Sequence, residues 1–200
     1  MKKLLIPILV IVGILFVLYF VFGGRYNTAI TLQEDAKTAW SNVESAYQRR
    51  SDLIGNLVKT VQGAADFERN TLKDVIDARS KATSINIDPA NITPDQIAQF
   101  QQAQSGLTSA LSRLLVTVER YPDLKANQNF LNLQTQLEGT ENRINVERNR
   151  YNEAVGNYTK YTEKFPNNLI LSFFGRFEEM ARFKAEEGSK KAPDVDFDFK

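Results

Sequence analysis

Cysteine and histidine are both absent from this chain of 200 residues. Without a thiol there is no disulfide, no thiolate nucleophile and no cysteine-rich metal site. Without an imidazole the chain lacks the usual general base and the commonest zinc ligand. The composition therefore predicts a protein that is not an enzyme and that holds no metal or other cofactor.

Neither sign of charge predominates, because the chain has 25 Lys and Arg residues and 24 Asp and Glu residues. The basic residues are scattered, whereas a nucleic-acid-binding protein concentrates them on one face. We therefore expect no nucleic-acid partner. Closely spaced carboxylates, such as Asp74 with Asp77 or Glu138 with Glu141, are compatible with acid–base chemistry but are more typical of a solvated helix face.

The chain has one long uncharged run, at residues 4–22 near the N-terminus. As a helix this run is roughly 28 Å long, close to the thickness of the hydrocarbon core of a bilayer. Aromatic residues cluster at its end, as they do at membrane interfaces. We predict a membrane anchor at residues 1–25, with the transmembrane helix at about 4–22 and the bilayer as a partner.

A cleaved signal peptide is the competing interpretation of this run. Such a peptide requires small residues at a cleavage site, whereas bulky aromatics precede Gly23 and Gly24. We therefore favour an uncleaved signal-anchor in the cell (inner) membrane, crossing it in a single pass. Lys2 and Lys3 outweigh Arg25, which by the positive-inside rule places the folded domain outside the cytoplasm.

Behind the anchor, apolar residues recur at intervals of three and four, which indicates an all-α fold. We expect helices at about 26–49, 51–84, 93–121 and 122–165 within a bundle domain at 26–166. Thr93, Pro94 and Gln96 form a capping-box sequence at the start of the third helix. The short connection at Pro122 predicts that the third and fourth helices are antiparallel neighbours.

The fourth helix has a heptad pattern, which is typical of coiled-coil packing. Because the loops are short, we expect an antiparallel up-down-up-down bundle of long helices behind the single N-terminal transmembrane helix. The heptad positions are Phe130, Leu137, Ile144, Tyr151, Tyr158 and Phe165.

Four charged residues interrupt or border the apolar stripes: Glu68, Arg79, Glu141 and Arg148. One interpretation makes them an internal polar site. Helix bundles that bind two metal ions, however, pair their carboxylates with Glu-x-x-His motifs, and this chain has no histidine. We favour a structural polar network that fixes the register of the helices.

The segment 167–187 is rich in large apolar residues and contains several basic ones. If the fourth helix returns toward the anchor, this segment arrives near the bilayer as an amphipathic helix, with Phe173, Phe174 and Phe177 as membrane-proximal candidates. An equally favoured alternative is that it caps the open base of the bundle. The tail at 188–200 is polar, and we expect it to be disordered.

Several stretches of the chain are long and unusual in sequence: Tyr26-Asn27, Trp40, QRRSDLIGNLVKTVQG (48–63), Glu68, Ala78-Arg79 and YPDLKANQNFLNLQTQLEGTENRINVERNRYNEAV (121–155). Through them the chain resembles the LemA family, over nearly everything from Gly24 to about Phe177. The resemblance implies an N-terminal membrane segment and a bundle of long helices, and it implies no reaction. It also implies the opposite orientation, with the short N-terminus outside. Gly55 and Phe67 depart from the family pattern, which usually has proline at the first position and often histidine at the second.

These observations favour a non-enzymatic, membrane-anchored scaffold or adaptor of the bacterial cell envelope. Its partners would be other envelope proteins or further copies of the chain. An alternative is a module that binds a lipid, peptide or metal at a polar site between helices. A third is remodelling of the membrane surface through residues 167–187.

Overall fold

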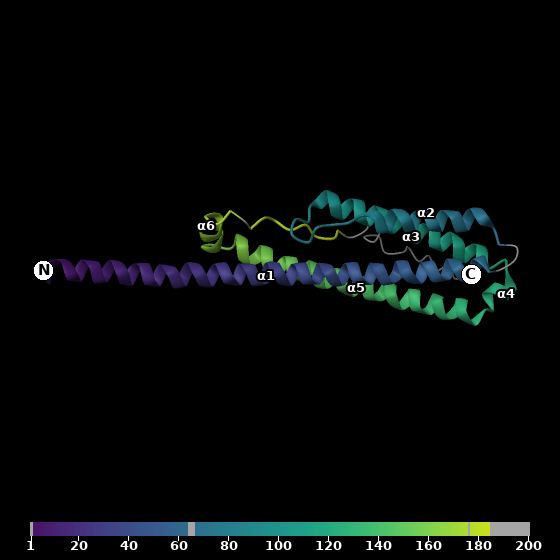
Figure 1. Cartoon of the computed structure of the whole chain (residues 1–200), viewed down its shortest axis with the longest axis horizontal. Coiled ribbons are helices and arrows are strands. Elements are labelled where there is room, and N and C mark those ends of the chain that lie inside the picture. The colour runs from purple at the N-terminus through teal and green to yellow at the C-terminus, as the bar shows by residue number, and fades with distance from the viewer. Residues whose placement is uncertain (1, 64–66, 176, 185–200) are drawn as a thin grey trace, which may run out of the picture.

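The computed structural model describes residues 2–63, 67–175 and 177–184, with side chains from residue 7 onward. These residues form helices and no strand, so the all-helical prediction is confirmed for them. The helices are α1 (Lys2–Gln62), α2 (Arg69–Ser84), α3 (Pro94–Val118), α4 (Pro122–Lys125), α5 (Gln128–Glu163) and α6 (Asn167–Ser172). Figure 1 shows an elongated molecule in which α1 is the longest element.

The apolar run and the first helix of the domain are one continuous helix, α1, of 61 residues. At about 1.5 Å per residue it is roughly 90 Å long. Its N-terminal part is long and apolar enough to cross a membrane. Apolar side chains from Ile8 to Val21 are exposed, and the first buried one is Ala29. The domain therefore begins a few residues after the apolar run, on the same helix.

The expected boundary between helices at 26–49 and 51–84 is wrong, because α1 continues through this point to Gln62. Neither Arg49 nor Arg50 breaks a helix, and the chain leaves α1 only at Gly63. The helix predicted at 51–84 is consequently divided between the end of α1 and α2.

The predicted capping box at the start of α3 is present. The Thr93 hydroxyl accepts a hydrogen bond from the Gln96 backbone N–H at 3.3 Å, and the Gln96 side-chain oxygen accepts one from the Thr93 N–H at 2.9 Å. The expectation that the last two long helices are close neighbours is wrong, however. α3 packs mainly on α2, and α5 packs along α1 in the opposite direction (Figure 1).

The helix predicted at 122–165 is interrupted after α4 by Asn127, which caps α5. The Asn127 side-chain oxygen accepts hydrogen bonds from the N–H groups of Asn129 and Phe130, at 2.9 and 3.2 Å. The Asn127 side chain thus provides an acceptor for backbone N–H groups in the first turn of α5, which have no partner within the helix. The heptad side chains are buried from Phe130 to Tyr158, whereas Phe165 lies beyond the end of α5 and is 73% exposed.

The half of the core nearer the apolar end of α1 is centred on Trp40, which is fully buried. Its ring centroid lies 5.3 Å from that of Tyr151, 5.7 Å from that of Phe183 and 5.8 Å from that of Phe100. These residues come from α1, α3, α5 and the C-terminal segment. Trp40 thus holds together parts of the chain that are distant in sequence. A second core, built on Leu57, Val61 and Leu114, fills the far half.

The helix expected at 167–187 is much shorter, because α6 ends at Ser172 and residues 177–184 are not helical. Gly175 has a φ of 61°, a left-handed conformation that turns the chain away from the helix. We call residues 177–184 the strap. It lies along the side of the domain against α5, and not across the open base of the bundle where the alternative expectation placed it. The tail at 188–200 lies outside the described residues.

Side chains of α5 bind the backbone of the strap. The Tyr151 hydroxyl donates to the Ala181 carbonyl at 2.7 Å, and the Tyr158 hydroxyl donates to the Glu178 carbonyl at 2.9 Å. The Asn152 amide donates to the Phe183 carbonyl and accepts from the Phe183 N–H, at 3.1 and 2.9 Å. The strap therefore satisfies backbone groups without forming a helix of its own.

Replacing Phe183 by alanine tests whether the strap is an integral part of the fold. Phe183 is 6% exposed and stacks on Trp40, so Phe183→Ala should lower the free energy of unfolding by about 3–5 kcal/mol. Denaturation followed by circular dichroism measures this change, and the emission of Trp40 should change as well. Val116→Ala, at a position that is 71% exposed, is the control. Equal effects of the two variants would contradict the assignment.

Candidate functional site

The four charged residues singled out in the sequence do not meet at one site. Glu68 pairs with Arg120 at 3.1 Å, at the exposed end of α2. Arg148 lies 4.9 Å from the centre of the Phe183 ring and donates to the Lys184 carbonyl at 3.5 Å, so it contacts the strap. Arg79 and Glu141 make separate contacts, which are described below. The four side chains thus connect different pairs of elements along the domain.

Arg79 binds α1 across a glycine. Its Nε donates to the Ser51 carbonyl at 2.8 Å, and its Nη2 lies 3.8 Å from the Asp52 carboxylate. A Cβ atom at Gly55 would lie 3.3 Å from the Arg79 Cζ, so the absence of a side chain makes room for the guanidinium. Gly55, one of the two departures from the family pattern, therefore allows the Arg79 guanidinium to approach α1 closely.

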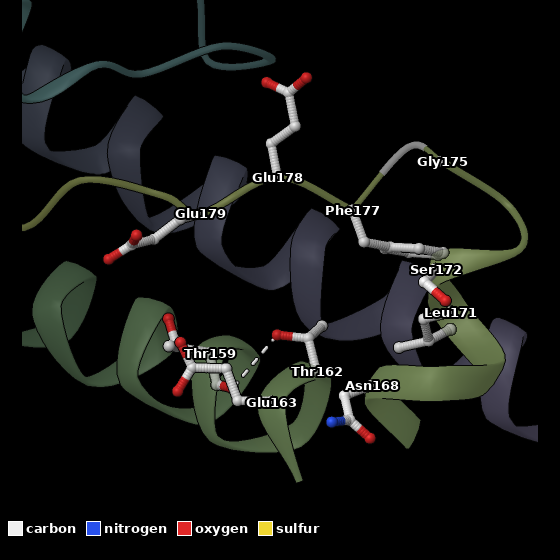
Figure 2. Close-up of a pocket in the computed structure, with 10 residues that line it drawn as sticks. All are labelled: Thr159, Thr162, Glu163, Asn168, Leu171, Ser172, Gly175, Phe177, Glu178 and Glu179. Carbon is white, nitrogen blue, oxygen red and sulfur yellow. Dashed lines mark hydrogen bonds between the residues drawn. The ribbon is translucent and has the colours of Figure 1, made fainter. Parts of the chain in front are cut away.

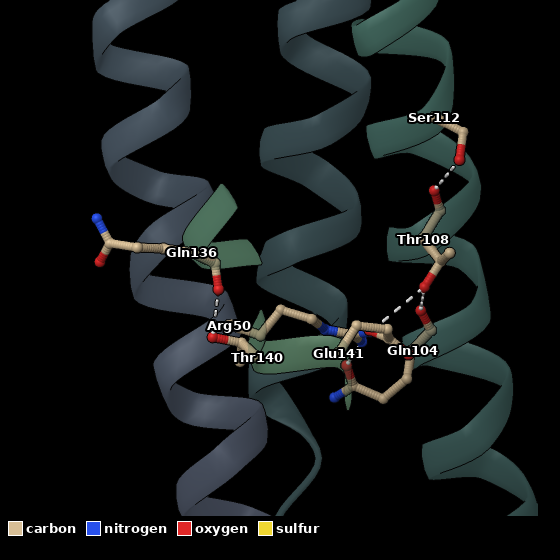
Figure 3. Close-up of polar contacts among 7 residues, drawn as sticks. All are labelled: Arg50, Gln104, Thr108, Ser112, Gln136, Thr140 and Glu141. Carbon is tan, nitrogen blue, oxygen red and sulfur yellow. Dashed lines mark hydrogen bonds and ion pairs between the residues drawn. The ribbon is translucent and has the colours of Figure 1, made fainter. Parts of the chain in front are cut away.

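A buried guanidinium links three helices at the middle of the domain (Figure 3). Arg50 of α1 is 5% exposed. Its Nη1 donates to the Glu141 carboxylate of α5 at 2.8 Å, and its Nη2 donates to the Gln104 side-chain oxygen of α3 at 2.5 Å. Because a buried charge requires partners, this arrangement favours one register of the three helices.

Arg50 was not among the residues selected from the sequence. A signal for it existed, since Arg50 lies between Tyr47 and Ile54 at intervals of three and four, on the apolar face of α1. Its assignment to a boundary between two helices hid this position. Glu141, which was selected, is half-exposed and serves as its partner.

A polar pocket of about 360 Å³ lies where the end of α5, α6 and the strap meet (Figure 2). Glu163, Glu178 and Glu179 are among its lining residues, together with Thr159 and Thr162. In Figure 2 the Glu178 and Glu179 side chains extend from the strap in different directions. Across the described parts of the chain, acidic side chains do not gather into a group of three or more suited to a metal ion.

The three phenylalanines predicted to be near the membrane have different surroundings. Phe173 is 82% exposed and Phe174 is 43% exposed. Phe177 is half-buried, at the edge of the pocket in Figure 2, and its ring lies 5.6 Å from that of Tyr26 on α1. These residues are therefore placed close to the point where α1 emerges from its apolar run.

Glu44 has an altered acidity. Burial raises the pKa of its carboxyl above the ordinary value of 4.5, and the Trp40 side chain partly offsets this rise. Burial also raises the pKa of the Tyr151 hydroxyl, so this group remains protonated and able to donate its hydrogen bond. We assign neither side chain a catalytic role.

The architecture defines a class of helical proteins in which an N-terminal apolar helix, consistent with a single membrane span, continues directly into the folded domain. The chain belongs to the LemA family, whose model matches residues 39–197. The family assignment suggested by the sequence motifs is thus confirmed.

Curated relatives include two kinds of protein. Magnetosome protein MamQ 2 of Paramagnetospirillum magneticum is 29% identical, over 80% of this chain and 65% of its own length. Magnetosome protein MamQ of Magnetospirillum gryphiswaldense is 28% identical, over 76% of this chain and 62% of its own. Protein LemA of Metamycoplasma hominis is 26% identical, over 86% and 74%. The chain therefore spans slightly less than two thirds of the length of these magnetosome relatives.

The Arg50 network predicts unequal effects of removing its two charges. Arg50→Ala leaves Gln104 and Glu141 without their donor and should cost about 3 kcal/mol of stability. Glu141→Gln should cost less than about 1 kcal/mol, because the Glu141 side chain is half-exposed. Chemical denaturation of both variants measures these costs. Activity lost at full stability would instead identify a binding site.

The raised pKa of Glu44 predicts a pH-dependent stability. The folded state binds the proton of Glu44 more tightly than the unfolded state does, so stability declines as the pH rises through the folded pKa. Glu44→Gln removes this decline. The melting temperature of the variant relative to the unaltered protein should therefore increase between about pH 4 and pH 7. Ser45→Ala is the control, and parallel pH profiles for Glu44→Gln and the unaltered protein would refute the assignment.

Proposed function

We propose that the protein is a non-enzymatic scaffold or adaptor of the cell envelope that holds an elongated helical domain in a fixed relation to the bilayer. The observation that carries this proposal is the continuity of α1, which extends from the apolar run to Gln62 without a break. A flexible linker would leave the domain free to reorient, whereas a helix transmits its direction along its length. The domain is thus suited to presenting surfaces to partners at a set height.

Helix faces rather than an enclosed site supply the surfaces for partners. Apolar side chains remain exposed on three helices, notably Ile76 on α2, Val116 on α3 and Val146 on α5. They are spaced along the domain and do not surround a cavity, which suits contacts with other envelope proteins or with further copies of the chain. The membership in the LemA family and the magnetosome relatives support a membrane-associated role.

Three finer features belong to the same proposal. We retain the antiparallel up-down-up-down bundle with coiled-coil packing of α5, supported by the buried heptad side chains. We also retain the uncleaved signal-anchor in the inner membrane, supported by the extension of α1 through Gly23 and Gly24. The positive-inside argument from Lys2, Lys3 and Arg25 favours an outward-facing domain.

The pocket in Figure 2 supports a second candidate function, which is the binding of a small polar molecule or a peptide. Its volume of about 360 Å³ is in the range of small-molecule sites, and Glu163, Glu178 and Glu179 are among its lining residues. The combined variant Glu163→Gln, Glu178→Gln and Glu179→Gln should then abolish function at unchanged melting temperature. If function survives this neutralisation, the pocket is not the site.

Crosslinking of the full chain in its native membrane, followed by mass spectrometry, tests the scaffold. Specific crosslinks should connect α2, α3 or α5 to a partner or to a second copy. A chain that stays monomeric and uncrosslinked under these conditions would refute the proposal. Labelling of the domain by a membrane-impermeant reagent in intact cells determines its side of the membrane in the same samples.

A helix break at the base of the domain provides the sharper prediction. Gly24→Pro disrupts α1 between the apolar run and the domain and should abolish or scatter the partner crosslinks, while Trp40 emission stays native. Gly24→Ala is the matched control, since a Cβ there has no neighbour within 4 Å and alanine favours the helix. Identical crosslinks in the two variants would show that rigid coupling is unnecessary.

A further inference from the structure

The short helix α6 buries some apolar side chains against the protein and leaves others exposed. Ile170 and Leu171 are buried, at 8% and 3% exposure. Leu169 and Phe173, four residues apart and so on one face of the helix, are 56% and 82% exposed. Phe165, in the turn that precedes α6, is 73% exposed. Asn168 and Ser172 are the polar residues exposed on α6. Apolar side chains that remain exposed close together mark a surface covered by lipid or by another protein.

The position of α6 decides between these environments. The Arg25 side chain donates a hydrogen bond to the Asn167 side chain, and the Tyr161 hydroxyl at the end of α5 donates to the Arg25 carbonyl at 3.3 Å. The Tyr26 ring lies 4.8 Å from that of Phe174. These contacts hold α6 against the few residues of α1 that directly follow the apolar run. Figure 1 shows α6 at the end of the domain nearest the N-terminus.

The geometry points to a second lipid contact: we propose that Phe165, Leu169 and Phe173, here called the α6 stripe, insert into the interfacial region of the bilayer that α1 crosses. Phe22, the last residue of the apolar run, is about 4.5 Å along the helix axis from Arg25, the residue that holds α6. Interfacial helices bury their apolar faces about 5–10 Å into the headgroup boundary, so the stripe lies within reach.

This contact differs from the scaffold function, because it concerns the lipid surface and not a protein partner. The carboxylates that line the nearby pocket belong to Glu163 at the end of α5 and to Glu178 and Glu179 of the strap, and none is part of the α6 stripe. The contact therefore depends on apolar burial and does not require anionic lipid. The domain then touches the membrane at a second place beside α1. This second contact limits the tilt of the elongated domain and fixes how deeply the apolar run of α1 sits in the bilayer.

Fluorescence quenching by brominated lipids tests the proposal on the full chain. The variant Phe173→Trp is reconstituted in phosphatidylcholine vesicles whose acyl chains carry bromine near the headgroup end. Trp40, the single native tryptophan, is fully buried and provides the unquenched background. The emission of the new tryptophan should fall by roughly half relative to unbrominated vesicles, because its ring lies at the depth of the bromines.

Val116→Trp is the matched control, because Val116 is also exposed and apolar but lies near the end of α3, in the half of the domain distant from α6. Its emission should not change with brominated lipid. Equal behaviour of the two variants would overturn the proposal. Circular dichroism and the Trp40 emission verify that each variant is folded.

Self-association through the stripe is the alternative occupant, and it gives a different result. A second copy covering the stripe would shield the tryptophan of Phe173→Trp from bromine and would yield crosslinks between two α6 segments. Either observation refutes the lipid contact. Quenching that persists when the protein is diluted across many vesicles supports it, since dilution lowers self-association but leaves the bilayer contact unchanged.

Discussion

The backbone hydrogen bonds of α1 continue from the apolar run into the centre of the folded domain, and the other elements are positioned relative to this helix. α5 packs along it, Arg50 projects from it to α3 and α5, and α6 is held against it at Arg25. Because the apolar run and the part of α1 that holds the core are the same helix, a tilt of one is a tilt of the other. The orientation of the domain is consequently coupled to that of the apolar run.

The C-terminal segment completes the same assembly from the opposite end of the sequence. Phe183 enters the aromatic cluster at Trp40, and Tyr151 and Tyr158 bind the backbone of the strap. A helical strap would have satisfied its own backbone groups, so these tyrosines would have lost their acceptors. The strap therefore extends because α5 supplies the hydrogen bonds, and the fold depends on contacts between residues about 140 positions apart, such as Trp40 and Phe183.

The features predicted correctly from the sequence depend on local patterns. The apolar run, the capping box at Thr93 and the heptads of α5 each follow from residues within a few turns of one another. The errors concern competition between local and distant contacts. Periodicity alone did not reveal that α1 passes through Arg50, that Asn127 starts a new helix, or that the strap is extended. The partners of Arg50 come from two helices distant in sequence, so the network required the structure.

The distribution of charge and apolar surface supports the proposed scaffold role. The buried charge of Arg50 is used to hold three helices in register, and Glu68, Arg79 and Arg148 each join a different pair of elements. Polar groups that stabilise separate contacts are not arranged around a common substrate. Outside the apolar run of α1, exposed apolar side chains gather at α6 and the residues that flank it. Water disfavours that surface and lipid does not, which is the physical basis of the proposed contact between α6 and the bilayer.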